Sequence, residues 1–504
     1  MGQPSITIIG AGFGGITMAL ELRRAGLTDI TILEQADDVG GVWRDNTYPG
    51  AACDVPSPLY SISSEPNPEW SRRFSEQPDI LAYLRDIADR HNLLSLVRFG
   101  VTVTAAEFDE RTNRWSVHTA GGEVVESDVL VTAVGQLSRP ALPDIDGRET
   151  FAGPAFHSAQ WDHSVPLAGK RVAVIGTGAS AIQFVPAIAP QVRGMTLFQR
   201  SAPWILPKPD RVYHDWHHRI FRSVPATLRG ERFLTWGIFE VLTVGLLHTR
   251  QRGGFAGALA RRHLEKQVVD PDLRAALTPD YEPGCKRMLL SDDYYPALTR
   301  DNVDLVVDAI ERIEPDGVRT VDGTLHPADV IVYGTGFAAT NFLAPMTVRG
   351  RGGRTLRNTW SDGAQAYLGI TTAGFPNFFM LYGPNTNLGS GSIVYMLESQ
   401  ARHITGLVGW LVEQPGCAVE VDAGVERRFN GRIQRRLDDS VWSLCSSWYR
   451  TASGRITTNW PGTVTTYRRR TRRPDRRDYR ITGTRTVPAR TPPAPDAAGS
   501  RRLR

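Results

Sequence analysis

Two stretches of the chain, far apart in the sequence, share one pattern of apolar and polar positions. Residues 5–9 and 171–175 are short runs rich in Ile and Val, and each precedes a glycine-rich turn and a segment with helical periodicity. This order predicts a strand, a tight turn and a helix at both places. We therefore predict an α/β fold that contains two Rossmann-like dinucleotide-binding domains.

The first turn has the pattern Gly10-x-Gly12-x-x-Gly15, with Phe13 between its glycines. Such glycines let the backbone approach a pyrophosphate, which then lies at a helix N-terminus. The next predicted strand, "DITILE", ends in Glu34. A carboxylate there accepts hydrogen bonds from both ribose hydroxyls and repels a 2′-phosphate, so these five residues predict a site for FAD or NAD.

The second turn repeats the pattern with an alanine at its third small position. The residues that we expect to contact a nucleotide here are Gly176, Thr177, Gly178, Ser180 and Ala181. The following strand ends in Gln199-Arg200-Ser201, without a carboxylate. Arg200 and Ser201 can bind a 2′-phosphate, which predicts an NADP(H) site. The alternative is a second FAD-like or degenerate domain with an incidental surface arginine.

Two nucleotides with different ribose contacts indicate hydride transfer from NADPH to a bound flavin, so we predict FAD and NADPH as cofactors. The four cysteines, Cys53, Cys285, Cys417 and Cys445, are widely spaced and form no C-x-x-C pair. This spacing argues against a disulfide framework, a dithiol redox centre and a metal site, and it favours a reducing cytosol. Electron transfer to an iron–sulfur or haem protein remains an alternative.

The segment between the two turns, "FAGPAFHSAQWD", is unusually aromatic for a connector. It contains Phe151, Gly153, His157, Trp161 and Asp162 in the pattern F-x-G-x-x-x-H-x-x-x-W-[PD]. In these residues the chain resembles the type I Baeyer–Villiger monooxygenases, which belong to the class B flavoprotein monooxygenases. The related flavin-containing monooxygenases, which oxidise nitrogen and sulfur, usually carry Tyr or Phe in place of Trp161.

Further segments share this resemblance, which extends over about residues 4–466. It implies flavin contacts at Gly41, Trp43, Asp54, Tyr60 and Val103, a matching tyrosine at Tyr48, a catalytic arginine at Arg287 in "GCKRMLL", and a substrate-side tryptophan at Trp448 in "SSWYR". Arg44 follows Trp43, where the family commonly has Tyr or Trp. We interpret His157 as a structural residue of the connector that also touches NADP.

The resemblance also implies a reaction. NADPH reduces FAD, O₂ adds to form a flavin C4a-peroxide, and the peroxide anion attacks a ketone to give an ester or lactone. Arg287 would keep the anion stable because guanidinium does not lose its proton, and Asp54 would orient Arg287. The enzymatic alternative is oxidation of nitrogen or sulfur. A non-enzymatic alternative is a flavin-binding regulator or a membrane-anchored interaction protein.

Motif positions and composition predict the organisation of the chain. The predicted parts are an FAD domain at 1–145 and 333–466, a connector at 146–165, an NADP domain at 166–210 and 285–332, a helical insertion at 211–284, and a disordered Arg/Pro-rich tail at 467–504. Within the insertion, the apolar run 233–248 predicts a buried amphipathic helix, with membrane-surface contact as the minor alternative.

The net charge of +5 comes from the tail, where 13 Arg oppose 3 Asp. Few apolar residues occur there, so we predict that it does not fold. An arm for anionic lipid or nucleic acid is the alternative, but no nucleic-acid-binding motif supports it and we predict no nucleic-acid partner. The chain enters a strand within five residues, which argues against a signal peptide and favours a cytoplasmic location.

Overall fold

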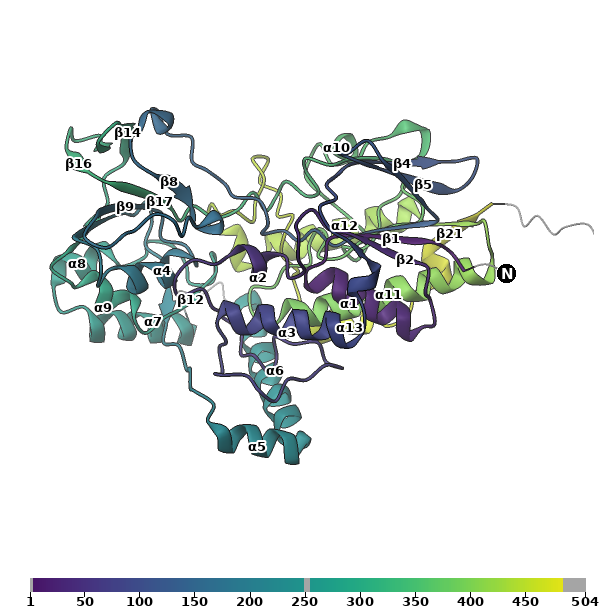
Figure 1. Ribbon diagram of the computed structural model, residues 1–504, viewed down its shortest axis with the longest axis horizontal. Helices are drawn as coiled ribbons and strands as arrows, with labels where there is room; N and C mark the ends of the chain where they lie inside the picture. Colours follow the sequence, from purple (N-terminus) through teal and green to yellow (C-terminus); the bar gives the residue numbers. More distant parts are fainter. Residues whose placement is uncertain (1–2, 249–253, 484–504) are drawn as a thin grey trace, which may run out of the picture.

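The computed structural model describes residues 3–248 and 254–483. The chain forms two lobes, each built around a five-stranded parallel sheet, and a pair of helices extends below them (Figure 1). The predicted α/β class with two Rossmann-like units is confirmed. Here the first lobe is the one that contains the Gly10 turn, and the second lobe contains the Gly176 turn.

The first lobe has a sheet in the order β19-β7-β1-β2-β3, with all pairs parallel. Its strands are β1 (Ile6–Ile9), β2 (Ile30–Leu33), β3 (Val97–Arg98), β7 (Val129–Thr132) and β19 (Phe378–Met380). Helices α1 (Phe13–Arg24), α3 (Gln77–Arg90) and α11 (Ile393–Glu413) share its largest apolar cluster. A four-stranded sheet, β18-β4-β5-β6, packs on the opposite face through Phe108 and Trp115. Coverage of both faces explains why every residue of β1 is buried.

The second lobe has the sheet order β13-β10-β9-β17-β8, again parallel throughout. Its strands are β8 (Ala155–His157), β9 (Arg171–Ile175), β10 (Gly194–Phe198), β13 (Val303–Val306) and β17 (Val330–Tyr333). Helices α4 (Ala181–Ile188) and α9 (Tyr294–Leu298) pack on one face. The segment 146–165 is therefore more than a connector, because its β8 is the edge strand of this sheet.

The remaining elements support these two sheets. They are α2 (Val42–Asp45), α10 (Leu356–Thr359), α12 (Ala423–Asp438), β4 (Val103–Asp109), β5 (Arg114–Thr119), β6 (Val124–Ser127), β11 (Ile205–Leu206), β12 (Leu289–Leu290), β14 (Ile310–Glu314), β15 (Gly317–Thr320), β16 (Leu325–Pro327), β18 (Thr347–Arg349) and β20 (Ala418–Val421). The antiparallel β14–β15–β16 sheet packs on the second face of the second lobe's main sheet.

The insertion is helical, as predicted, with α5 (Asp215–Ser223), α6 (Pro225–His248), α7 (Gly254–Gln267) and α8 (Pro271–Ala276). The prediction that the run at 233–248 is buried is wrong, because Phe233 is 64% exposed and Val241 is 73% exposed. Only one face of α6 packs on the protein, which leaves the apolar residues of its other face outside. No helix in the described residues is long and apolar enough to cross a bilayer.

The predicted disorder of the tail is wrong for residues 467–483. Helix α13 (Val464–Thr471) packs on α11, and strand β21 (Tyr479–Thr482) pairs antiparallel with β20. The segment folds despite its many arginines because Tyr467 and Tyr479 are buried in the apolar core of the first lobe. Residues 484–504 lie outside the described residues.

Candidate active site

The first turn is shaped by glycines that tolerate no side chain. Gly10 has a φ of 103°, and a Cβ added to it would lie 2.8 Å from the carbonyl oxygen of Ala133. A Cβ on Gly15 would lie 1.9 Å from the carbonyl oxygen of Gly10. Gly41 closes the turn from the other side, since its own Cβ would approach the Cα of Gly12 to 3.2 Å. The glycines thus leave the N-terminus of α1 accessible to a pyrophosphate, as the binding of a dinucleotide requires.

Glu34 lies directly after β2 and is only 5% exposed. Its carboxylate accepts hydrogen bonds from the backbone N–H groups of Ala11 at 2.8 Å and Ala36 at 3.1 Å. Arg44, which departs from the usual aromatic residue of the family, pairs with Glu34 at 3.2 Å. A carboxylate has about four acceptor positions, so these partners still leave it able to accept from a ribose hydroxyl.

Three aromatic residues lie together beside this turn. The indole Nε1 of Trp43 donates to the hydroxyl of Tyr60 at 3.1 Å, and Phe13 contacts the Tyr60 ring edge-on at 5.2 Å between centroids. Val103 does not join them, because it begins β4 and packs in the cluster between the sheets. Val101 lies nearer than Val103 to Glu34, since the N–H of Val101 donates to the carbonyl of Glu34 at 2.9 Å. The contact of Val103 with FAD stays a prediction.

The second turn has a similar backbone. Gly176 has a φ of 106°, and a Cβ there would lie 2.6 Å from the carbonyl oxygen of Gly334. Ser180 precedes α4, and Ala181 begins it. The hydroxyl of Thr177 donates to the carbonyl of Ser201 at 3.0 Å, which attaches the turn to the end of β10.

A cationic site forms where β10 ends. Lys286 donates to the hydroxyl of Ser201 at 3.0 Å. Burial lowers the pKa of Lys286, and the positive charge of Arg200 lowers it further. Neither cation has a carboxylate within salt-bridge distance among residues 3–248 and 254–483. Two neighbouring cations and a hydroxyl fit a phosphate, and the sequence pattern gave no indication of Lys286 as a phosphate contact.

Arg287 and Asp54 form an ion pair between the two lobes. The guanidinium Nε and Nη2 both donate to Oδ2 of Asp54, at 2.8 and 2.5 Å. The charge of Asp54 raises the pKa of Arg287 above its already high ordinary value. The Nη1 group also reaches the carbonyl oxygen of Leu388 at 3.5 Å. The structure thus brings together two residues that are far apart in the sequence, and it holds the guanidinium in one orientation.

Two tyrosines that the sequence analysis missed surround this pair. Burial raises the pKa of Tyr449 to about 12, and the charge of Arg287 opposes the rise. Burial also raises the pKa of Tyr382, whose hydroxyl donates to Asn387 at 2.8 Å. Trp448 is 39% exposed and packs against Tyr449 with 4.4 Å between ring centroids. Adjacency to Trp448 was the sequence signal that could have indicated Tyr449.

A disulfide joins Cys285 to Cys445, with 6.1 Å between their Cα atoms. The expectation that the cysteines form no disulfide is therefore wrong, and the reducing environment inferred from it loses its support. The two cysteines are 160 residues apart in the sequence, which hides their proximity. The bond ties the segment of Arg287 to that of Tyr449. Among the described residues, no cluster of three side chains could hold a metal ion.

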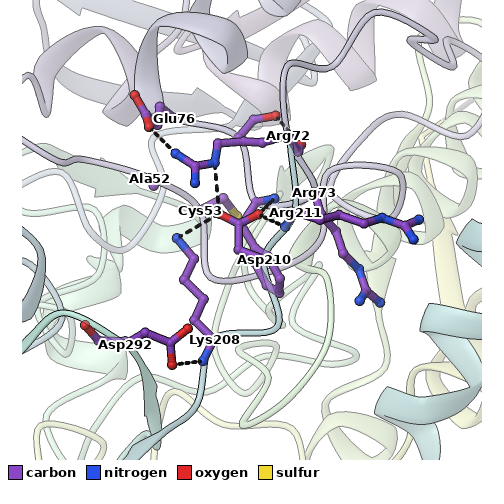
Figure 2. Close-up of polar contacts among 12 residues, drawn as sticks. Ala52, Cys53, Arg72, Arg73, Glu76, Lys208, Asp210, Arg211 and Asp292 are labelled. Atoms are coloured by element: carbon purple, nitrogen blue, oxygen red, sulfur yellow. Dashed lines mark hydrogen bonds and ion pairs between the residues drawn. The ribbon is translucent and has the colours of Figure 1, made fainter. Parts of the chain in front are cut away.

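A second polar contact between the lobes lies beside Cys53 and was also missed. Figure 2 shows Asp210 between Arg72 and Lys208. Its carboxylate lies 2.8 Å from Nε of Arg72 and 3.9 Å from Nζ of Lys208. Asp210 also accepts the backbone N–H of Phe74 at 3.1 Å. Since Lys208 follows β11 of the second lobe and Arg72 belongs to the first, these contacts join the lobes close to Asp54.

The fingerprint segment packs inside the second lobe. His157 is 2% exposed, burial lowers its pKa, and its Nδ1 accepts the N–H of Ala159 at 3.1 Å. A Cβ on Gly153 would lie 2.5 Å from the carbonyl oxygen of Asp329. Other members of the motif also have local partners: Phe151 packs in the β14–β15 cluster, Trp161 contacts Phe184, and Asp162 accepts from Ser164. The motif thus fixes β8 against the sheet, and its predicted contact with NADP stays a prediction.

The comparisons with known proteins agree with this geometry. The pyridine nucleotide-disulphide oxidoreductase family matches residues 7–216. A Baeyer–Villiger monooxygenase of Streptomyces coelicolor is 47% identical over 479 residues, which cover 94% of this chain and 92% of that protein.

Solved structures show the same similarity. An oxidised steroid monooxygenase with bound NADP has a TM-score of 0.84 and 32% identity, over 95% of this chain and 99% of the other. OTEMO, in complex with FAD and NADP, has a TM-score of 0.85 and 28% identity, over 95% of this chain and all of the other. The two Rossmann turns and the arginine–aspartate pair between the lobes agree with this similarity. Because the Streptomyces coelicolor enzyme is 47% identical over most of both chains, the chain belongs to the Baeyer–Villiger monooxygenases.

Proposed function

We propose that Arg287, held by Asp54, is the permanent positive charge with which this Baeyer–Villiger monooxygenase directs one oxygen atom of O₂ next to a ketone carbonyl. The cofactors are FAD and NADPH, and the product is an ester or lactone. Oxidation of nitrogen or sulfur is not favoured, given the Baeyer–Villiger name of the relative with 47% identity.

The two turns support a division of the nucleotides between the lobes. The buried carboxylate of Glu34 repels a 2′-phosphate, so the first turn suits FAD. Arg200, Ser201 and Lys286 offer the opposite charge, so the second turn suits NADPH. FAD bound at the first turn and reduced by NADPH would supply the electrons that activate O₂.

The role of Arg287 follows from its charge and its placement. A guanidinium keeps its proton at all accessible pH values, and the ion pair with Asp54 raises its pKa further. Negative charge that develops on the ketone oxygen during attack is stabilised by a cation already fixed in position. Removal of one such group typically slows a reaction by about 10²- to 10³-fold.

Asp54 acts as a positioning residue. It accepts two hydrogen bonds from one guanidinium, which restricts the rotation of the arginine side chain. The carboxylate comes from the first lobe and the arginine from the second, so the pair aligns the charge only when the lobes meet. The contacts of Asp210 with Arg72 and Phe74 support the same approach of the lobes.

The experiment compares Arg287→Ala with Arg287→Lys under NADPH, O₂ and a simple cyclic ketone. We expect both variants to contain normal FAD. Ester formation should fall by about 10²- to 10³-fold in Arg287→Ala, and part of it should return in Arg287→Lys because the lysine keeps the charge. An Arg287→Ala enzyme that forms ester at the wild-type rate would refute the proposed role.

A further inference from the structure

The helical insertion carries an unusual share of the exposed apolar surface. More than half of the large apolar side chains that are exposed among the described residues lie between residues 211 and 284. Helices α5 and α6, which carry most of them, form a projection on the lower side of the molecule (Figure 1). Concentrated apolar exposure of this kind marks an interaction surface.

The exposed residues form one face of α6. They are Phe233, Leu234, Ile238, Val241, Leu242 and Val244, and each is at least 43% exposed. At the helical repeat they fall within one half of the helix circumference. The other positions of this half between residues 233 and 245 are glycines, and the single charged residue of that stretch, Glu240, lies outside this half and accepts the N–H of Val464. We call this half the outer face of α6.

The inner side of α6 is firmly attached to the first lobe. Arg232 donates to the carbonyls of Pro58 at 2.7 Å and Ser61 at 3.0 Å. Glu240 accepts the N–H of Val464 at 2.9 Å, at the start of α13. Trp236 and Phe239 pack against the core of that lobe. The helix therefore cannot simply turn to bury its outer face.

Two exposed arginines lie beside the apolar surface. Trp216 and Ile220 form an exposed stripe along α5, and the exposed Val224 directly follows the helix. Arg219 lies three residues after Trp216, and Arg229 lies four residues before Phe233, so each is adjacent to an exposed aromatic side chain.

One acid of the first lobe, Glu69, pairs with Arg222 of α5 at 3.0 Å. Neither Arg219 nor Arg229 has a salt-bridge partner within the part of the chain that the structure describes. Glu231 is engaged by Arg211, Glu240 points inward, and Asp215 is the one carboxylate of α5 and α6 that stays exposed. The α5–α6 arm thus presents apolar side chains flanked by Arg219 and Arg229, which form no ion pair among the described residues.

We propose that the α5–α6 arm docks onto the surface of an anionic lipid bilayer. Aromatic and aliphatic side chains on one helix face enter the boundary between headgroups and acyl chains, while flanking arginines bind anionic headgroups. Each such arginine strengthens binding to an anionic surface. The docked helix lies on the membrane and does not cross it, in agreement with the absence of a spanning helix among the described residues.

A second copy of this chain fits the surface less well. A symmetric dimer places the same patch of both subunits face to face. That contact would bring two sets of Arg219 and Arg229 together with Asp215 as the one exposed carboxylate of each arm. Repulsion between like charges disfavours this pairing, whereas anionic lipid satisfies the same cations.

Docking has a consequence for the substrate, which rests on the proposed role of Arg287, whereas docking itself does not. Thr243, on the inner side of α6, lies 3.4 Å from the carbonyl oxygen of Ser390. Two residues earlier, the carbonyl of Leu388 contacts Arg287. The docking helix thus adjoins the segment beside the catalytic arginine, so ketones that dissolve in lipid are the favoured substrate class.

The test measures co-sedimentation of the full chain, loaded with FAD, with two kinds of vesicle. One contains phosphatidylcholine alone, and the other contains equal parts of phosphatidylcholine and phosphatidylglycerol. We expect binding to the anionic vesicles that weakens as salt is added. The double variant Phe233→Glu with Val241→Glu should bind at least tenfold more weakly, because charges on the outer face oppose insertion.

The matched control places glutamates at two exposed apolar positions outside the arm, Val321→Glu with Val412→Glu, and should bind like the wild type. All proteins keep residues 484–504, so any binding by that Arg-rich sequence is common to them. Normal FAD content and NADPH oxidation will show that the variants fold. Binding of the Phe233 and Val241 variant at the wild-type level, or absence of the wild type from both vesicle pellets, overturns the proposal. A dimer in sedimentation velocity that this variant abolishes, without vesicle binding, overturns it in favour of a second copy.

Discussion

Gly10 and Gly176 occupy the same position in the two Rossmann turns, and their φ angles of 103° and 106° nearly coincide. The helices that follow differ. Helix α1 begins directly after Gly12, whereas α4 begins at Ala181, the third small position of its turn. The first turn thus packs more tightly on its strand, while the second turn accommodates a methyl group.

The electrostatic settings of the turns differ more than their backbones. In the first lobe, the strand that follows the turn and its helix, β2, ends next to Glu34, a buried carboxylate. In the second lobe, the corresponding strand, β10, is followed by Arg200, which lies beside Lys286. The comparison shows that backbone shape selects a dinucleotide, while the side chain at the end of the next strand selects which one. Substitutions in the two turns should therefore have unequal and predictable effects.

The largest difference is expected at the glycines. In Gly15→Ala the new methyl would clash with the carbonyl oxygen of Gly10 at 1.9 Å, so α1 must move and FAD should be lost from the purified protein. In Gly178→Ala, at the second glycine of the other turn, the nearest atom is the carbonyl oxygen of Gly334 at 3.7 Å, which is an ordinary contact. Flavin absorbance per protein measures both, and equal retention in the two variants would contradict the comparison.

Loss of the cationic site should have the next largest effect. A hydrogen bond from a charged group contributes about 1.5–3 kcal/mol, so Lys286→Ala should raise the KM for NADPH by roughly 10- to 100-fold. Arg200→Ala should act in the same direction. The KM for NADH, which lacks the 2′-phosphate, should change little in either variant. A parallel rise for NADH would mean that these residues do not bind the phosphate.

The reciprocal change in the first turn is expected to be smaller. Glu34→Gln keeps the shape of the side chain but removes its charge, which weakens the contacts with Ala11 and Arg44. We expect FAD to dissociate about tenfold more readily, equivalent to about 1.4 kcal/mol. Fluorescence of released flavin on dilution measures this, and the KM for NADPH serves as the control because it should stay constant.

The smallest effect is expected for Ala181→Gly, which gives the second turn the glycine pattern of the first. Glycine in a helix costs about 0.5–1 kcal/mol relative to alanine, and the mutation removes a methyl that packs near Gly334. Urea unfolding should show a loss of that size, with normal FAD content. A loss of several kcal/mol would indicate that Ala181 does more than begin α4.

The two turns could be predicted from the sequence because their signals are local. Gly10, Glu34 and Arg200 each follow a strand within a few residues, so spacing alone places them at the carboxyl ends of parallel strands. The resemblance to a known family indicated Arg287 and Asp54, and the structure brings them within hydrogen-bond distance. Their proposed roles go beyond that geometry.

Features that depend on contacts between distant segments could not be predicted in this way. The disulfide between Cys285 and Cys445 and the phenol of Tyr449 reach the Arg287 segment only after both lobes have folded. The exposure of α6 was missed for a related reason. Apolar periodicity shows that a helix has an apolar face, but it does not show whether anything covers that face.

Lys286 and Arg287 are neighbours in the chain with different proposed tasks, so they provide the most direct test of the account. The measurement is the molar ratio of ester formed to NADPH consumed, at saturating NADPH and ketone, in Lys286→Ala and Arg287→Ala. We predict the wild-type ratio for Lys286→Ala, and a ratio at least tenfold lower for Arg287→Ala although NADPH is still consumed. A wild-type ratio in Arg287→Ala would contradict the claim that this guanidinium directs the oxygen to the ketone.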